Sequence, residues 1–95
     1  MNIVDFSEQE VEITAVYFRA ERGQTSVASF PRRMMLDGRE YTFSRDSWRY
    51  QVQKGQELVQ LFDVSDGQSR YRLRLGPTKH WTLVNIKSMK IKNND

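Results

Sequence analysis

Residues 70–75 read Arg-Tyr-Arg-Leu-Arg-Leu and come shortly after an Asp66-Gly67 pair. Because successive side chains of a β-strand point to opposite faces, this alternation predicts a strand with one apolar and one cationic face. The apolar face carries Tyr71, Leu73 and Leu75. The other face carries an arginine row, Arg70, Arg72 and Arg74, spaced roughly 6.8 Å apart at about 3.4 Å per residue. The functional question is whether this row meets a ligand or only water.

Two Asp-Gly pairs predict two β-hairpins, since Asp-Gly between apolar runs is a strong hairpin signal. Asp37-Gly38 joins a strand at 26–36 to one at 39–43. A two-residue turn there places Leu36 opposite Arg39 and Met34 opposite Tyr41. Asp66-Gly67 joins residues 57–64 to 69–75 in the same way. A two-residue turn at this second position predicts the opposed pairs Phe62–Tyr71, Leu58–Leu75, Asp63–Arg70, Leu61–Arg72 and Val59–Arg74.

The other segments complete an all-β pattern. Residues 10–20 predict a strand whose second half is buried on both sides, because Val16 and Phe18 make both faces apolar. Pro31 predicts an edge or a bend, since proline cannot donate to a ladder. Residues 48–52 form another strand segment, which we expect to continue 39–43 through a bend at 44–47. A last strand follows at 80–86.

These six short strands, with turns between them and no helical period, predict an antiparallel all-β domain. At a length of 95 residues we expect a small, partly open barrel rather than an immunoglobulin-type sandwich. The expected organisation is a lead-in at 1–9, a single β domain at 10–87 and a flexible basic tail at 88–95.

Composition narrows the classes of function. There are no cysteines, so neither disulfides nor a thiolate metal site is available, and the core must come from the two Trp, four Tyr and five Phe. Neither a signal peptide nor a membrane-spanning run is recognisable, which favours a cytoplasmic protein without a membrane partner. The net charge of +3 is too small to argue for nucleic acid by itself.

The sequence carries no catalytic pattern. A nucleophile needs an adjacent base, and the only histidine is His80, between Lys79 and Trp81 at a strand start. Asp66 is explained by its turn and Asp63 by a predicted partner, Arg70. No Gly-rich phosphate loop, Walker motif or zinc spacing is present. We therefore expect a protein that is not an enzyme and that has neither cofactor nor metal.

The candidate binding site is the arginine row together with nearby aromatic residues. Small barrels bind single-stranded nucleic acid by combining a cationic groove with exposed aromatics for stacking, here Trp48 and Tyr50. Two alternatives compete with that interpretation, the first being that charge alternation is common on a strand face that meets only water. Glu8, Glu10 and Glu12 form an acidic row with the same period, which would neutralise the arginines if the two strands were neighbours. The arginines available to widen the patch are Arg32, Arg33, Arg39, Arg45 and Arg49.

The stretch Pro31-Arg32-Arg33 … Gly38-Arg39-Glu40-Tyr41, with Trp48 after it and His80-Trp81-Thr82-Leu83 near the end, is similar to small bacterial β domains of unknown function. In these domains a Pro-Arg-Arg stretch precedes a Gly-Arg-x-Tyr hairpin and a Trp-containing closing strand. Met34-Met35-Leu36 departs from the aromatic residues expected there. Some relatives of that kind accompany Y-family DNA polymerases, so the resemblance implies a fold and adds some weight to a nucleic-acid function.

Two functions remain open at this stage. The first is a protein-interaction module that uses a mixed face of Val59, Leu61, Arg72 and Arg74, or an open sheet edge near Pro31. The alternative is weak, sequence-tolerant binding of nucleic acid through the arginine row, with Arg49, Trp48 and Tyr50 contributing. Whether the acidic row lies beside the basic one distinguishes them.

Overall fold

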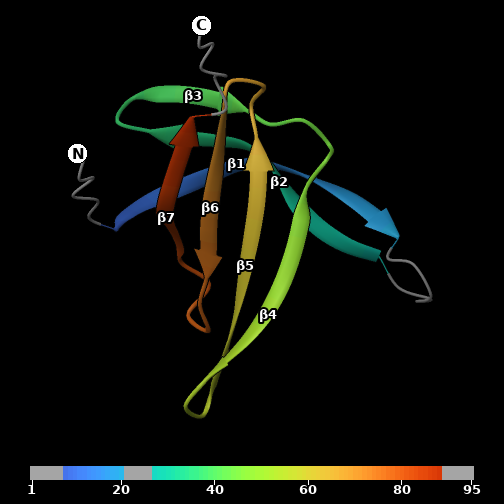
Figure 1. Cartoon of the computed structure of the whole chain (residues 1–95), viewed down its shortest axis with the longest axis vertical. Helices are drawn as coiled ribbons and strands as arrows, with labels where there is room; N and C mark the ends of the chain where they lie inside the picture. The colour runs from blue at the N-terminus through green and yellow to red at the C-terminus, as the bar shows by residue number, and fades with distance from the viewer. Residues whose placement is uncertain (1–7, 21–26, 89–95) are drawn as a thin grey trace, which may run out of the picture.

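A computed structural model describes residues 8–20 and 27–88. The lead-in expected before residue 8 and the tail expected beyond residue 88 lie outside these ranges. The described chain forms one seven-stranded antiparallel sheet in the order β3-β2-β1-β7-β6-β5-β4 (Figure 1). Its strands are β1 (Gln9–Ala20), β2 (Val27–Leu36), β3 (Arg39–Thr42), β4 (Trp48–Lys54), β5 (Glu57–Ser65), β6 (Ser69–Leu75) and β7 (Trp81–Ser88).

The all-β, antiparallel, partly open fold expected from the sequence is confirmed. The sheet curls without closing into a barrel, because β3 and β4 are its two edges and do not pair with each other. The prediction that 48–52 continues the strand at 39–43 is wrong for the same reason. These two segments end up at opposite edges, so the described residues form seven strands rather than six.

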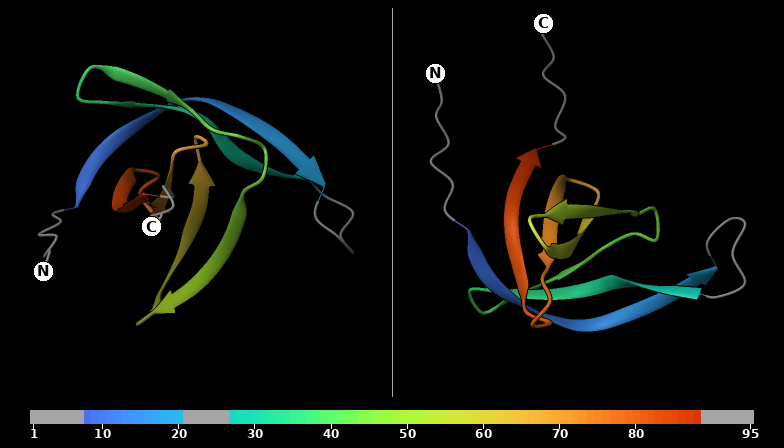
Figure 2. Two further views of the ribbon diagram at one scale, coloured as in Figure 1. Left: turned by 45° about the horizontal axis from the view of Figure 1, so that its top comes forward. Right: turned by 90° about the horizontal axis from the view of Figure 1, so that it is seen from below.

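The curl folds the sheet into two layers. In the right-hand view of Figure 2 the β1–β2–β3 part crosses beneath the part formed by β4 to β7. Aromatic side chains pack between the layers: the rings of Phe30 and Phe62 meet edge-on at 5.9 Å, and Phe43 lies 5.4 Å from Tyr71. The buried residues that form this core are Val11, Tyr17, Phe30, Met34, Phe43, Phe62, Val64, Tyr71, Leu73 and Leu83.

The first Asp-Gly hairpin has the predicted register. Leu36 pairs with Arg39 and Met34 with Tyr41. Asp37 and Gly38 both have positive φ angles, 54° and 78°, as a type I′ turn requires. Beyond the end of β3, the Phe43 amide donates to the Arg32 carbonyl at 2.8 Å, so Phe43 and Arg32 continue the pairing register of the hairpin.

The predicted register of the second hairpin is wrong by two residues. Asp63 pairs with Arg72 rather than Arg70, and the other pairs are Phe62–Leu73, Leu61–Arg74, Val64–Tyr71 and Gln60–Leu75. The cause is the Asp66 side chain, which accepts the amides of Gln68 and Ser69, both at 2.9 Å. The Asp66 amide also donates to the Ser69 carbonyl at 3.2 Å, so the turn lies at Gly67-Gln68, one residue later than predicted. Because a shift of two conserves the facing of every side chain, the core and outer faces remain as predicted.

The second half of β1 is not buried on both sides. Val16 and Phe18 are 46% and 67% exposed. A register irregularity lies around Ala15, and β7 pairs only with Gln9–Val11, so the rest of β1 has β2 as its strand partner. Pro31 lies opposite Val16 in a stretch of β2 that β3 does not pair with, which agrees with the predicted edge or bend.

The link between β3 and β4 is held by β1 and β5. The Tyr17 hydroxyl donates to the Arg45 carbonyl at 2.9 Å and lies 3.0 Å from the hydroxyl of buried Ser47, from which it can accept. Arg19 donates to the Ser47 carbonyl at 3.0 Å, and the Ser44 amide donates to the Ser65 carbonyl at 2.8 Å. These bonds fix the point where the chain crosses to the far edge and starts β4.

Candidate interaction site on the outer face

The outer face is the side of β4–β7 that points away from the aromatic core. Cross-strand pairing brings the predicted site residues from β4, β5 and β6 together there: Trp48 is opposite Asp63, Tyr50 opposite Leu61, and Leu61 in turn opposite Arg74. The residues that we assign to the outer face are Trp48, Tyr50, Val52, Val59, Leu61, Asp63, Arg70, Arg72, Arg74, Asn85 and Lys87.

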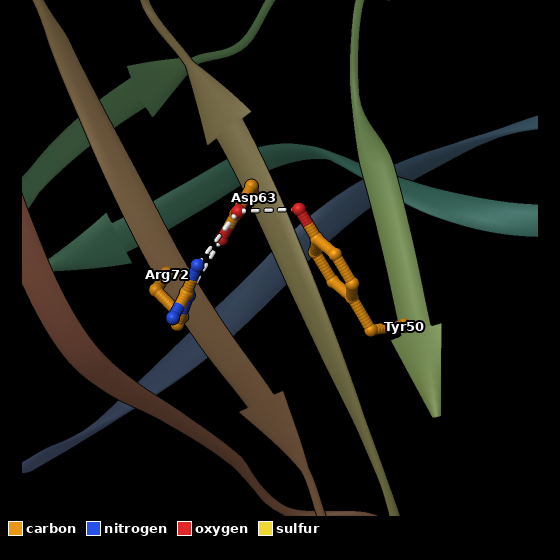
Figure 3. Close-up of polar contacts among 3 residues, drawn as sticks. All are labelled: Tyr50, Asp63 and Arg72. Carbon is orange, nitrogen blue, oxygen red and sulfur yellow. Dashed lines mark hydrogen bonds and ion pairs between the residues drawn. The ribbon is translucent and has the colours of Figure 1, made fainter. Parts of the chain in front are cut away.

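Asp63 lies at the centre of this face (Figure 3). Arg72 donates to both of its oxygens, from Nε at 2.8 Å and from Nη2 at 3.0 Å, and the Tyr50 hydroxyl donates to Oδ2 at 3.1 Å. The bidentate bond from Arg72, and then the bond from Tyr50, lower the pKa of Asp63 despite its partial burial. The same contact raises the pKa of Arg72. Arg72 is therefore a fixed cation whose charge is already neutralised.

Arg74 is neutralised by the acidic row, although not in the way the sequence suggested. β7 lies between β1 and β6, so the two rows are not neighbours. Glu8 nevertheless reaches across and accepts two bonds from Arg74, at 2.7 and 3.1 Å. This bond lowers the pKa of Glu8. Glu10 instead lies 3.7 Å from His80. The acidic row therefore neutralises the arginine row only in part, through the single pair of Glu8 and Arg74.

Arg70 differs from its two neighbours in the arginine row. It lies directly opposite Lys87, and like charges in that position repel each other. Neither side chain forms a hydrogen bond or ion pair within residues 8–20 and 27–88. A hollow of about 240 Å³ lies beside them and is lined by Asp63, Arg70, Tyr71, Arg72, Asn85 and Lys87. Three cations and one carboxylate line this hollow, so an anion would find a net positive charge there.

The predicted apolar part of the face is only partly available. The predicted pair Val59–Arg74 is wrong, since Arg74 pairs with Leu61, and Val59 is 7% exposed and so offers little surface. Leu61 is half-buried and faces Arg74. On the face formed by Val59, Leu61, Arg72 and Arg74, the apolar side chains are therefore mostly covered, and both arginines already bind carboxylates of the same chain.

The exposed apolar side chains of the outer face lie instead on β4. Trp48, Tyr50 and Val52 are 59%, 43% and 39% exposed. Arg49 points to the opposite side, where it donates to the Gln60 side chain at 3.1 Å. β4 is also one end of the sheet, and no other strand of the described chain pairs with its outer side. An edge strand with an apolar face is a feature that suits a partner.

The remaining arginines do not widen the row. Arg32 and Arg33 lie on β2 and Arg39 begins β3, which are three and four positions away from β6 in the sheet order. Arg32 donates to the Phe43 carbonyl, and Arg39 stacks on Tyr41. Arg45 lies over the ring of Tyr17. These side chains support the β1–β3 layer.

Sequence reasoning missed two features of the site. Lys87 opposite Arg70 became visible only with the β6–β7 register, which contains an irregularity after Arg72. Asp66 also accepts the Tyr71 hydroxyl at 2.7 Å, which fixes the loop that sets the register. Burial raises the pKa of Asp66, but the bonds from Tyr71, Gln68 and Ser69 together outweigh it and leave that pKa lowered. An Asp followed by Gly-Gln-Ser is a signal for this loop, because Asp side chains bond to amides two residues on.

Other site types find no support in the described residues. No group of three or more His, Cys, Asp or Glu side chains there is arranged to hold a metal ion. Nor does that part of the chain contain a helix long and apolar enough to cross a membrane. Comparisons with family models, with curated proteins and with solved structures find no match.

Proposed function

We propose that this chain is a non-enzymatic protein-interaction module that binds an extended polypeptide segment along the free edge of β4. The carrying observation is a seven-residue edge strand with three exposed apolar side chains on one face. An added strand satisfies the edge amides and carbonyls, while side chains at alternate positions supply specificity.

The edge is well formed for such addition. β4 contains no proline, and all seven of its residues pair with β5 in unbroken register from Trp48–Asp63 to Lys54–Glu57. The Tyr50 hydroxyl is bonded to Asp63, which is itself fixed by Arg72, so one of the contact side chains is pre-positioned. Pre-positioning lowers the entropy cost of binding. The matching segment is extended, with apolar residues at every second position and no cation opposite Arg49 or Lys54.

The test uses a displayed library of random linear peptides, selected on the protein at low surface density. We expect selected peptides to slow amide exchange at Gln51 and to lose binding to Gln51→Pro, which removes a backbone donor. Gln51→Ala, with the donor retained, should bind like the parent. Equal binding to the parent and to Gln51→Pro, at equal melting temperature, would contradict strand addition.

A second candidate function is favoured by the pair Arg70–Lys87. These opposed cations, with Arg72 beside them, are the part of the arginine row suited to phosphates of a nucleic acid. Such binding would be weak and would fall with salt, with a log–log slope of about −1.4 for two contacts on a single strand at roughly −0.7 each.

Fluorescence anisotropy of a labelled single-stranded oligonucleotide at two salt concentrations tests this candidate. Arg70→Gln together with Lys87→Gln should abolish binding. Arg39→Gln with Arg33→Gln makes the same charge change at the other end of the sheet and should have little effect. Equal losses from both pairs would indicate a response to net charge only and would remove the candidate.

A further inference from the structure

The hydrogen-bonding pattern between β4 and β5 shows which backbone groups of β4 bond to β5 and which point away from the sheet. Gly55 and Gln56 form a two-residue turn between the paired residues Lys54 and Glu57, with a positive φ of 63° at Gly55. In such a hairpin the flanking pair exchanges hydrogen bonds, and every second residue from it does so too. The residues between these, at positions 49, 51 and 53, direct their amides and carbonyls outward.

The first hairpin supports this assignment independently. There Leu36 and Arg39 flank the two-residue turn, and counting in steps of two leads to Arg32 and Phe43. The Phe43 amide donates to the Arg32 carbonyl at 2.8 Å, as the alternation requires. The same counting applied to β4 puts Gln51, its middle residue, on the outward side.

Because the central residue faces outward, β4 can pair with itself about a two-fold axis at Gln51. Gln51 then meets Gln51 of the second copy, and Gln53 meets residue 49. All seven residues are paired in this register. A shift by one residue would place residues whose backbone groups point outward opposite residues whose backbone groups point toward β5. A shift by two would keep the hydrogen-bonding pattern but leave two residues of each strand unpaired.

The side chains are compatible with this register. On the outer face, Tyr50 of one copy lies opposite Val52 of the other, an aromatic–β-branched pair of the kind that stabilises sheets. Trp48 lies opposite Lys54, where an ammonium group can stack on the indole. The cations of β4 never face each other. The two copies of Arg49 are four residues apart along the pair, or roughly 14 Å at about 3.4 Å per residue, beyond the Debye length of about 8 Å at physiological salt.

We propose that the segment bound by β4 is β4 of a second copy of this chain, so that two sheets join through an antiparallel β4–β4 pair centred on Gln51. This inference rests on the proposed function, since it names the partner for the same edge (Figure 1). The interface formed by one pair of seven-residue strands is small compared with stable interfaces, which bury roughly 1,200–2,000 Å². The expected result is therefore a reversible monomer–dimer equilibrium.

Single cysteines test the register, because the chain has none of its own. Directly opposed residues of a hydrogen-bonded antiparallel pair have Cα atoms about 5.5 Å apart, within the roughly 4.4–6.8 Å that a disulfide spans. Under mild oxidation Gln51→Cys should form a covalent dimer. Arg49→Cys and Gln53→Cys should each cross-link poorly alone and efficiently when mixed. Glu40→Cys, on the other edge of the sheet, is the matched control.

Two outcomes would overturn the self-pairing. One is cross-linking of Gln51→Cys no faster than that of Glu40→Cys. The other is cross-linking of Arg49→Cys alone as efficient as that of its mixture with Gln53→Cys, which would indicate a different register. Sedimentation of the unmodified chain should give a mass that rises with concentration, and of Gln51→Pro a mass that stays monomeric.

The same measurements separate this inference from the proposed function. A chain that stays monomeric at every concentration, while library peptides still protect Gln51, overturns the self-pairing and leaves strand addition in place. Peptides that bind Gln51→Pro unchanged overturn strand addition, and the β4–β4 pair with it.

Discussion

The two edges of this sheet differ in length and in the means by which they are anchored. β3 has four residues, and its last aromatic side chains enter the core: Tyr41 contacts Tyr71, and Phe43 directly after the strand is fully buried. β4 has seven residues, none of them buried, and its contacts include the β5 ladder, the Tyr50–Asp63 hydrogen bond and the Arg72 guanidinium 5.8 Å from the centre of the Tyr50 ring. The short edge strand, β3, is therefore anchored in the core, whereas the side chains of the long edge strand, β4, lie at the surface.

Their free hydrogen-bonding groups differ accordingly. By the alternation of the first hairpin, β3 directs Glu40 and Thr42 outward, and the charged Arg39 and Glu40 are typical protection against edge pairing. β4 directs three residues outward, with a neutral glutamine at the centre. Two of the four residues of β3 are charged, against two of the seven residues of β4, Arg49 and Lys54, so the protection against edge pairing is weaker on β4.

The largest contrast is expected from removing an aromatic residue near each edge. Phe43→Ala should lower the free energy of unfolding by about 3–5 kcal/mol, because it leaves a cavity in the core. Trp48→Ala, at an exposed site on β4, should change it by no more than about 0.5 kcal/mol. Urea denaturation measures both. Similar losses from the two variants would mean that β4 is anchored in the core after all.

A smaller effect is expected from Asp63, which joins β4 to β6 through Tyr50 and Arg72. Asp63→Asn removes the charge that Arg72 binds and should cost about 1 kcal/mol in unfolding free energy, since the side chain is partly exposed. Glu8→Gln, which breaks the more exposed pair with Arg74, should cost less. If Glu8→Gln were the more damaging change, the central position given to Asp63 would be wrong.

The same carboxylate sets a pH dependence. The pKa of Asp63 is lowered in the folded chain by Arg72 and Tyr50, so the charged form stabilises the fold above the unfolded pKa of about 3.9. That contribution should fall as the pH drops through the lowered folded value. Denaturation at a series of pH values should show a shallower acid decline for Asp63→Asn. An unchanged acid decline would show that other carboxylates dominate it.

The smallest effect on stability, but a decisive one on association, is expected from Val52→Lys. Val52 is 39% exposed, so folding should be nearly unaffected. In the β4–β4 register the new lysine faces Tyr50 of the other copy and interrupts the apolar strip, so the dimer should weaken. Sedimentation at matched concentrations measures this, and Val27→Lys, at another exposed valine, is the control.

The two Asp-Gly hairpins explain how much of the fold could be predicted. Where Asp37 and Gly38 both take positive φ, the turn alone set the register, and the predicted pairs were correct. At Asp66 the side chain accepts two amides and the turn lies one residue later, at Gly67-Gln68, so the predicted pairs are two residues off while the predicted faces are correct. The face of each side chain follows from local alternation, but the choice between Arg70 and Arg72 as partner of Asp63 does not.

Strand order was beyond the sequence for a related reason. The placement of 48–54 at the far edge depends on tertiary bonds from Tyr17 and Arg19 to the link around Ser47, and no local pattern indicates them. The strand order also determined where the candidate site lies. Trp48 and Tyr50 were recognised as exposed aromatics near arginines, but only the sheet order made their strand an edge.

Amide hydrogen exchange, followed by NMR at a low and a high protein concentration, tests the central claim that β4 is a pairing edge. We predict that exchange at Gln51 and Gln53 slows as concentration rises, while exchange at Glu40 and Thr42 on β3 stays constant. Rates at Gln51 and Gln53 that do not change with concentration, or a slowing of equal size on both edges, would contradict it.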